Sequence, residues 1–363
     1  MRFVDEYRDK EQVRSLVRAI RQVVTRPWHI MEICGGQTHA IARYRLEEML
    51  PEEVKLLHGP GCPVCVTPVG IIDRALELAK RPDVILASFG DMMRVPGSRE
   101  DLLQIKARGA DIRILYSPLD AVSLAADHPD KKIVFFAIGF ETTAPVHMMA
   151  LKEAARRKLE NFYLHTSLFT VPPAIEAILS DPESCVDGFL AAGNGAYRHL
   201  AEKYKTPIVV TGFEPADLLL GIYCCLLQLE AGIYKVENVY KRVVPEEGNP
   251  PARALMEETL ELCDQEWRGL GTIPQSGLRL KEIFARQDAS HLLPALDAKA
   301  HKQCLEATSS GVEKGQCIAG DIMRGTKQTK DCPFFGTLCT PDHPVGAPMV
   351  SSEGVCAAYY RYK

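Results

Sequence analysis

The sequence predicts an α/β protein built from two open, mostly parallel sheets. Up to about residue 240, short apolar runs alternate with helical stretches, which is typical of βαβ units. The runs are almost continuously apolar, as expected of strands that are covered on both faces. The expected strands are 29–34, 54–58, 84–89, 112–116, 133–139, 161–166, 188–193 and 207–212.

An internal echo favours two open sheets over one closed barrel. IVFFAIGFETTAP (133–145) and PIVVTGFEPAD (207–217) both run from a strand through Gly-Phe-Glu into a helix. Two similar halves that face each other would leave a cleft between them. We therefore expect a first α/β domain over residues 1–130 and a second one over 131–240, with the cleft between them.

The expected helices alternate with these strands. Apolar residues recur at helical spacing over 9–24, which predicts an amphipathic helix there. Ser98 followed by Asp101 resembles a helix start, with a serine N-cap and an acid in the first turn. Further helices are expected at 71–80, 98–108, 145–159 and 215–231.

A third unit is expected over residues 241–363, where the alternation stops. PEEGNPP (245–251) interrupts the pattern, a helix is expected at 252–263, and a tail rich in glycine, proline and cysteine follows. Because this stretch lacks the apolar content for a core of its own, something else should hold it together. A metal cluster could do so.

Composition narrows the classes of function. The formal net charge of −4 gives no support for nucleic-acid binding, which usually needs a basic face. No apolar run approaches the roughly 18 residues of a membrane span, and MRFVDEYRDKEQ does not resemble a signal peptide. We therefore expect a cytoplasmic protein. In such a chain, 12 cysteines that are partly clustered indicate metal or redox chemistry.

The unusual polar motifs follow the expected strands. CGGQTH, GPGCPVC, GDMMRVPG and FETT each begin where an apolar run ends. In open parallel sheets, ligands bind outside the carboxyl ends of the strands. These motifs are therefore expected to gather at one edge and to form the functional site there.

Cys34 and His39 belong to the first of these motifs. Gly35 and Gly36 let the backbone approach a ligand closely, and a helix is expected to begin near Gln37. A thiol at a helix N-terminus has a lowered pKa, which makes Cys34 a candidate iron ligand or nucleophile. His39 is a candidate ligand, proton carrier or orienting group. The alternatives are a structural thiol and an ordinary surface or core histidine.

Cys62 and Cys65 form a Cys-x-x-Cys motif after a strand. Such a motif indicates a redox dithiol or half of a metal site. The chain has no second Cys-x-x-Cys motif that would complete a zinc ribbon. The redox pair is therefore the favoured interpretation, with a zinc half-site and a structural role as alternatives.

Glu141 and Thr142 lie in GFETT, at an expected helix start. They are candidates for a carboxylate and a hydroxyl that line the cleft. The alternative for Glu141 is only a favourable charge at a helix N-terminus.

Four further cysteines lie in the tail: Cys317, Cys332, Cys339 and Cys356. They are separated by 14, 6 and 16 residues, whereas zinc sites more often use close pairs. The spacing favours a cubane iron–sulfur cluster, and leaves zinc or no metal as alternatives.

Taken together, CGGQTH, GPGCPVC, GDMMRVPG, GFETT and the four-cysteine tail resemble the HypD family of hydrogenase maturation factors. EWRGLG and VSSEGVCAAYY are also similar to that family, and the resemblance covers nearly the whole chain. It implies two similar α/β domains, and a third domain that carries a [4Fe–4S] cluster. It also implies partnership with a small chaperone, HypC, and with a cyanide donor, HypE.

The resemblance implies roles for individual residues as well. Cys34 would be the iron-binding cysteine, Cys62 and Cys65 the redox pair, and the four tail cysteines the cluster ligands. The expected function is a redox-active scaffold that holds iron while the cyanide and carbonyl ligands of the [NiFe]-hydrogenase Fe(CN)2CO group are attached. Whether the chain is itself an enzyme stays open. The alternatives are an iron–sulfur-dependent dithiol/disulfide oxidoreductase and a zinc-stabilised binding module.

Two stretches depart from the family pattern. Many members have a Pro-Gly-His-Val-Ser loop where this chain reads AAGNGAYRHL (191–200), and HTSLFTVPP (165–173) also differs at its start. Both follow strands of the second half and should face the cleft. We therefore transfer no histidine role to His199.

Overall fold

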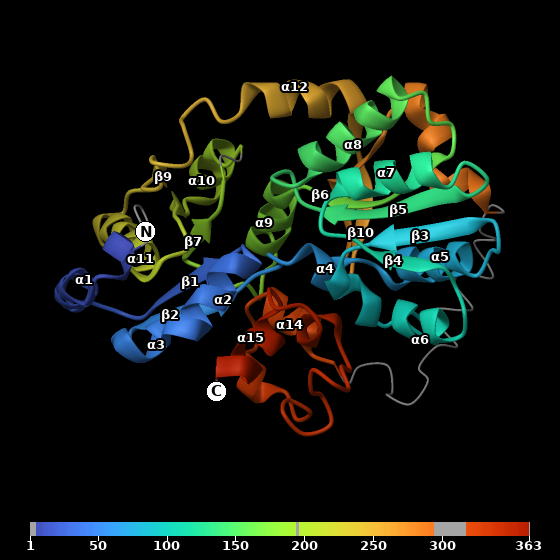
Figure 1. The fold of residues 1–363 in the computed structure, drawn as a ribbon. Helices are drawn as coiled ribbons and strands as arrows, with labels where there is room; N and C mark the ends of the chain where they lie inside the picture. Colours follow the sequence, from blue (N-terminus) through green and yellow to red (C-terminus); the bar gives the residue numbers. More distant parts are fainter. Residues whose placement is uncertain (1–4, 194–195, 294–316, 363) are drawn as a thin grey trace.

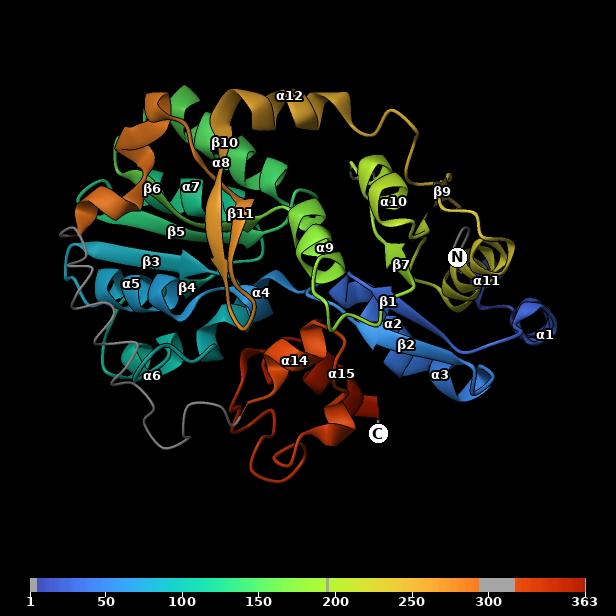
Figure 2. The same cartoon turned by 180° about the vertical axis from the view of Figure 1, so that it is seen from behind.

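Two sheets organise the molecule, as the computed structural model of the chain shows for residues 5–193, 196–293 and 317–362 (Figure 1, and Figure 2 from behind). The first sheet is parallel throughout. In spatial order it consists of β2 (Val54–His58), β1 (Trp28–Glu32), β7 (Gly188–Ala191), β8 (Ile208–Val210) and β9 (Val236–Asn238).

The second sheet combines a parallel part with an antiparallel hairpin. Strands β3 to β6 pair in parallel, and the hairpin of β10 and β11 adds to β6 in the antiparallel sense. The spatial order is β10 (Leu260–Trp267), β11 (Gly271–Leu280), β6 (Phe162–Phe169), β5 (Lys132–Gly139), β3 (Val84–Ser88) and β4 (Ile112–Ile114).

The predicted α/β class with two open sheets is confirmed, and all eight expected strands are present. Strand pairing does not follow the expected boundary at 130/131, however. The chain crosses between the sheets after β2, after β6 and again after β9. Consequently each sheet is assembled from two separate stretches of sequence. The echo that favoured two sheets has one copy in each of them, at β5 and at β8.

Helices cover both sheets, and apolar side chains fill the layers between them. Phe135 and Phe136, which are neighbours on β5, point to opposite faces and are both fully buried. Burying one such side chain stabilises the fold by about 1.5–3 kcal/mol. The α-helices are α1 (Lys10–Val23), α2 (Gly35–Tyr44), α3 (Leu46–Met49), α4 (Pro63–Val66), α5 (Val69–Ala79), α6 (Leu102–Ala107), α7 (Pro118–Asp127), α8 (Ala144–Arg156), α9 (Val171–Leu179), α10 (Arg198–Tyr204), α11 (Pro215–Ala231), α12 (Pro250–Thr259), α14 (Ala319–Met323) and α15 (Val355–Tyr362).

One helix start differs from its prediction. The N-cap of α6 is Asp101, whose carboxylate accepts a hydrogen bond from the backbone N–H of Gln104. Ser98 lies before the helix, and its backbone N–H and its hydroxyl both donate to Asp73. A carboxylate in reach of the N3 amide takes the capping role that the sequence had suggested for the serine.

The expected helix at 252–263 ends early. Helix α12 stops at Thr259, and the chain continues directly into the β10–β11 hairpin. Trp267 is fully buried at the end of β10, and its indole N–H donates to Ser276. Burial of this large side chain against the second sheet outweighs the helical pattern that precedes it.

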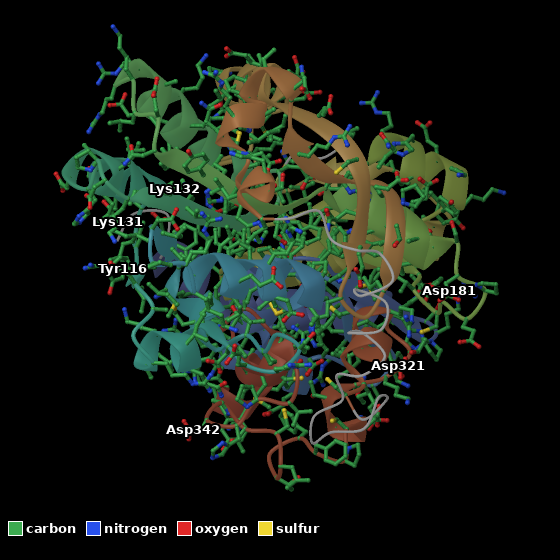
Figure 3. All side chains as sticks on the ribbon, turned by 90° about the vertical axis from the view of Figure 1, so that its right-hand side faces the viewer. Tyr116, Lys131, Lys132, Asp181, Asp321 and Asp342 are labelled. Carbon is green, nitrogen blue, oxygen red and sulfur yellow. A yellow bond between two sulfur atoms is a disulfide. The ribbon has the colours of Figure 1, made fainter. Side chains whose placement is uncertain are left out.

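The described C-terminal residues, 317–362, form a separate layer beneath both sheets (red in Figure 1). They contain α14, α15 and short 3₁₀ turns joined by irregular backbone. Figure 3 shows side chains of both charge signs at the surface, among them Lys131, Asp181 and Asp342. In the described part of the chain, no helix has the length and apolar character that crossing a membrane demands.

Candidate functional site

The polar loops predicted to gather do meet, but at the ends of two sheets and not at one edge. β1 and β2 belong to the first sheet, whereas β3 and β5 belong to the second. In Figure 1 the carboxyl ends of β1 and β3 both point towards the middle of the molecule. A Cβ on Gly193, in the loop after β7, would lie 3.2 Å from the Thr142 methyl, so loops of both sheets are in contact there.

Cys34 is the N-cap of α2, directly after β1. Its backbone N–H donates to Glu32 Oε2 at 2.9 Å, and its carbonyl accepts from the N–H of Gln37 at 2.8 Å. The helix therefore begins at Gly35, two residues earlier than predicted. A Cβ on Gly61 would lie only 2.3 Å from the Cys34 nitrogen, so no larger residue fits at position 61 without a backbone shift.

The electrostatics of Cys34 differ from the prediction of a lowered pKa. Burial, and after it the negative charge of Glu32, raise the pKa of the thiol to about 12. Hydrogen bonds from the backbone N–H groups of Gly36 and Gln37 act in the opposite direction but do not prevail. A free Cys34 thiol is therefore protonated near neutral pH, and a bound cation would have to displace the proton.

Glu32 and His58 form a buried pair beneath Cys34. They are register partners at the carboxyl ends of β1 and β2, and His58 Nδ1 lies 2.8 Å from Glu32 Oε1. Glu32 Oε1 also accepts the hydroxyl of Thr38. Burial lowers the pKa of His58, but hydrogen bonds to Glu32 and Glu47 outweigh this effect and raise it to about 9. The cationic imidazole compensates the buried carboxylate.

His39 faces the C-terminal layer. Its Nδ1 lies 3.0 Å from the carbonyl oxygen of Ser352, and its Nε2 lies 3.0 Å from the hydroxyl of Tyr362. Both ring nitrogens therefore have protein partners, and neither is available to a metal in this arrangement. Of the three roles considered for His39, this geometry suits the orienting role.

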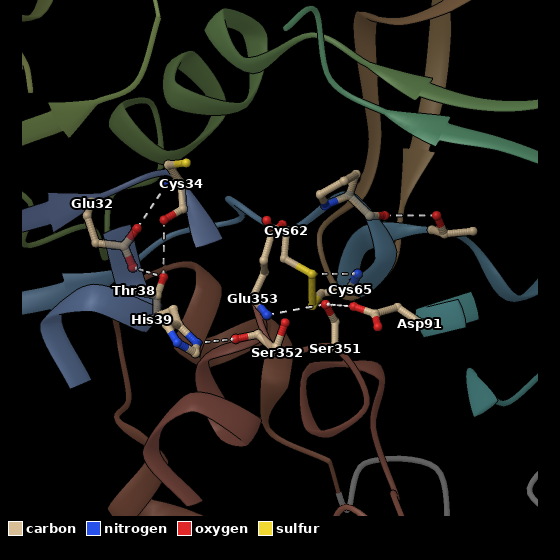
Figure 4. Close-up of a disulfide and its surroundings, with 12 residues drawn as sticks. Glu32, Cys34, Thr38, His39, Cys62, Cys65, Asp91, Ser351, Ser352 and Glu353 are labelled. Atoms are coloured by element: carbon tan, nitrogen blue, oxygen red, sulfur yellow. Dashed lines mark hydrogen bonds between the residues drawn. A yellow bond between two sulfur atoms is a disulfide. The ribbon is translucent and has the colours of Figure 1, made fainter. Parts of the chain in front are cut away.

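Cys62 and Cys65 are joined by a disulfide, with their Cα atoms 5.2 Å apart (Figure 4). Cys62 is the N-cap of the short helix α4, and its sulfur accepts the backbone N–H of Cys65 at 3.2 Å. Pro63 occupies the first helical position, where its missing N–H costs nothing. The motif thus presents two sulfurs close enough to cycle between dithiol and disulfide, and the redox role stays a prediction.

Glu141 and Thr142 lie where the two sheets meet. The Glu141 carboxylate accepts the backbone N–H of Val171 at 2.8 Å, so it caps α9 and not the helix that follows it. Burial raises the pKa of Glu141 to about 7. Thr142 is exposed. The expected acidic group at a helix N-terminus is therefore present, but at a neighbouring helix.

Two residues near Cys34 were not singled out from the sequence. Glu353 approaches from the C-terminal layer, and a Cβ on Gly35 would lie 2.5 Å from its Cβ (Figure 4). Tyr197 is buried in the loop that departs from the family pattern, and its pKa is raised by burial and then by the charges of Glu141 and Cys34. The signal for Glu353 was present in VSSEGVC. Residues 194–195 of the departing loop lie outside the described residues.

The four tail cysteines come together in one pocket. Cys317, Cys332, Cys339 and Cys356 all line it, and apolar side chains supply most of the remaining wall. A Cβ on Gly346 would lie 2.4 Å from the Cys317 sulfur, so this glycine leaves room for the thiol. Burial raises the pKa of Cys356, and the other three cysteines raise it further, which reflects how close the four sulfurs are.

The donor set of the pocket, four cysteine thiols, is one that both cubane clusters and zinc ions use. Throughout residues 5–193, 196–293 and 317–362, no three His, Cys, Asp or Glu side chains converge closely enough to hold one metal ion. The four thiols nevertheless share the wall of one pocket. A tetrahedral zinc site needs all its ligands within about 2.3 Å of one point, whereas cubane ligands stand around a larger body.

Fold and site together define a two-sheet α/β protein in which the Cys34 loop is hydrogen-bonded to the disulfide loop, from Gly35 N–H to the Gly61 carbonyl at 2.9 Å, beside a separate four-thiol pocket. The family model HypD, described as the hydrogenase formation hypA family, matches residues 11–363. The chain belongs to this family.

Full-length relatives agree with this assignment. The hydrogenase maturation factor HypD of Escherichia coli (strain K12) is 44% identical, over 100% of this chain and 98% of the relative. The proteins of the same name from Azotobacter vinelandii and Rhodobacter capsulatus are 45% and 43% identical, each over 100% of this chain and over 97% and 98% of their own lengths.

Proposed function

We propose that this hydrogenase maturation factor is a redox-active scaffold for assembling the Fe(CN)2CO group of [NiFe]-hydrogenase. It would hold iron together with the small chaperone HypC while the carbonyl ligand and cyanide from HypE are attached. The observation that carries the proposal is that one C-terminal segment contacts the Cys34 loop and also lines the four-cysteine pocket. Relatives named as hydrogenase maturation factors support the biological setting.

Iron is the substrate in this proposal, and Cys34 is its ligand from this chain. A soft thiolate suits low-valent iron that carries cyanide and carbonyl. In this proposal the remaining coordination would come from the partner chaperone and the incoming diatomic ligands. Sharing the iron between two proteins lets the finished group leave when they separate.

Cys317, Cys332, Cys339 and Cys356 would hold a resident [4Fe–4S] cluster. When bound, such a cluster supplies one-electron transfer at low potential. The Cys62–Cys65 disulfide consumes two electrons and two protons when its S–S bond breaks and two thiols form. A one-electron carrier of low potential would deliver these electrons in two separate transfers. The resulting dithiol would poise the iron held nearby by Cys34 for ligand attachment.

The decisive experiment replaces Cys34 by alanine and records infrared bands on the complex co-purified with the chaperone. We expect the cyanide and carbonyl bands to disappear in Cys34→Ala. A matched control is Cys224→Ala, which removes a half-buried thiol within α11 that belongs to neither the Cys34 loop nor the four-cysteine pocket; its bands should equal those of the wild type. Bands of wild-type strength in Cys34→Ala would sink the assignment.

A disulfide oxidoreductase is the second candidate, because the disulfide helix α4 packs against the 3₁₀ turn Ala347–Met349 that borders the pocket. This alternative predicts turnover of a disulfide substrate that persists in Cys34→Ala. Metal analysis of protein purified without oxygen distinguishes these two functions from the third candidate, a zinc-stabilised binding module. About four iron and four sulfide per chain indicate a cubane, whereas about one zinc without sulfide indicates a zinc-stabilised module.

A further inference from the structure

Helix α15 presents three functional side chains at intervals of three residues. Cys356, Tyr359 and Tyr362 therefore follow one another along one side of the helix. Cys356 lines the four-cysteine pocket. The Tyr359 hydroxyl lies 2.7 Å from His58 Nε2, and the Tyr362 hydroxyl lies 3.0 Å from His39 Nε2.

Both histidines are connected to the Cys34 loop, His58 through hydrogen bonds and His39 through the helix to which it belongs. His58 Nδ1 contacts Glu32 Oε1 at 2.8 Å, and Glu32 Oε2 accepts the backbone N–H of Cys34 at 2.9 Å. His39 belongs to α2, the helix that Cys34 caps, and α15 packs against α2. Two short chains of hydrogen bonds thus connect one helix of the pocket to the backbone around Cys34.

We propose that Tyr359 and Tyr362 are positioning residues that hold the Cys34 loop from α15, so that the order of the four-cysteine pocket and the order of the Cys34 loop are energetically coupled. Neither tyrosine touches the reacting atoms, because each acts through a histidine. The coupling to metal in the pocket rests on the proposed function, whereas the role of the hydroxyls does not. By linkage, filling the pocket would tighten the Cys34 loop, and filling the Cys34 site would tighten the pocket.

The test removes the two hydroxyls and keeps both rings. In Tyr359→Phe/Tyr362→Phe we expect hydrogen exchange in a peptide spanning residues 32–40 to accelerate at least tenfold, because the Glu32 carboxylate that accepts the Cys34 amide and the helix that Cys34 caps both lose their support. Iron and sulfide in the pocket should stay at the wild-type level. The cyanide and carbonyl infrared bands should weaken, and a purely structural role of the tyrosines would not produce that result with the pocket intact.

Tyr360→Phe is the matched control. Tyr360 lies on the same helix, is 37% exposed, and in the described structure its hydroxyl has no hydrogen-bond partner. It should leave both exchange and infrared bands unchanged. Should the double variant fold poorly, Tyr359→Phe alone is expected to accelerate exchange in the same peptide by a smaller factor. Wild-type exchange in both tyrosine variants would overturn the inference.

A second arm tests the coupling itself. Stripping the pocket metal from the wild type with a chelator should accelerate exchange at residues 32–40, and in Tyr359→Phe/Tyr362→Phe it should add little further acceleration. Equal additional acceleration in both proteins would refute the coupling. If wild-type protein carries neither pocket metal nor infrared bands, the proposed function fails, and the exchange of metal-free variants still decides the role of the hydroxyls.

Discussion

The two thiol regions of this molecule are held in different ways. Around Cys34, strand ends and a helix N-terminus fix the backbone, and a buried network through Glu32 and His58 supports it. Around the four-cysteine pocket, the described backbone is mostly irregular, and mainly apolar side chains and thiols form the wall. The comparison teaches that the chain itself pre-organises the Cys34 site, whereas regular secondary structure contributes little to the pocket, which would depend more on the proposed cluster.

The substitution with the largest expected effect removes one thiol of the four-cysteine pocket. Replacing the buried Cys339 by alanine should abolish metal loading as a whole, from about four iron per chain to less than about one, because a cubane depends on its full ligand set. Limited proteolysis should then cut within residues 317–362. Iron and sulfide analysis checks the first result and mass spectrometry of fragments the second.

Cys263→Ala serves as the control for this loss, since that thiol lies in β10 away from the pocket. It should retain both the metal and the resistance to protease. Full metal retention in Cys339→Ala would show that the pocket does not need its ligand set, and the contrast between the two regions would disappear.

The substitution with the next largest expected effect disrupts the Glu32–His58 pair beneath Cys34. His58→Leu leaves the Glu32 carboxylate buried without its cation, and should lower the free energy of unfolding by about 3–5 kcal/mol. Urea denaturation measures this loss in the free energy of unfolding. Arg8→Ala is the matched comparison, because it breaks the Arg8–Glu214 pair, in which Arg8 is 41% exposed, and should cost far less, since solvent screens an exposed ion pair. Similar losses in both variants would contradict the special role of the buried pair.

The same pair predicts a dependence of stability on pH. The pKa of His58 is raised from about 6.5 in the unfolded chain to about 9 in the folded one. Its stabilising contribution is therefore complete below about pH 6.5 and is lost as the pH rises through about 9, on the order of 3 kcal/mol in all. Urea denaturation between pH 6 and 10 should show this decline, and His58→Gln should flatten it. An equal decline in His58→Gln would assign it to other groups.

The smallest expected effect concerns close backbone packing. Gly61→Ala places a Cβ 2.3 Å from the Cys34 nitrogen, so it should cost about 1–3 kcal/mol through a forced backbone shift. Gly90→Ala places its Cβ at ordinary contact distance, 3.8 Å from Ile114, and should change stability by less than about 0.5 kcal/mol. Thermal unfolding measures the stability of both variants. Equal stability would show that the backbone of the Cys34 loop moves aside at little cost.

Much of the fold could be predicted from the sequence because buried parallel strands are apolar along their whole length. β2 begins and ends at the predicted residues, and so does α11. The β10–β11 hairpin was missed because only the two end residues of β10, Leu260 and Trp267, are buried, so β10 lacks the continuous apolar run of the other strands. Sheet membership was also missed, since no local pattern reveals where a chain crosses from one sheet to the other.

The candidate site was predictable in its residues but not in its electrostatics. Cys34 does cap a helix, yet its depth in the protein and the neighbouring Glu32 carboxylate raise the thiol pKa that the helix alone would lower. The contacts of Tyr359 and Tyr362 with His58 and His39 span about 300 residues of sequence. Such contacts arise only from tertiary packing, so motif reasoning could place the cysteines but not the network that supports them.

The crossing of the chain between the sheets has a consequence during synthesis. β1 lies between β2 and β7 in the first sheet, and about 130 residues separate the end of β2 from the start of β7. At roughly 5–20 residues per second, a ribosome takes on the order of ten seconds to make this stretch. During that interval the Cys34 strand has an unpaired edge outside the ribosome. The unpaired edge of β1 is therefore an aggregation-prone surface of the nascent chain, and β7 is the strand whose arrival covers it.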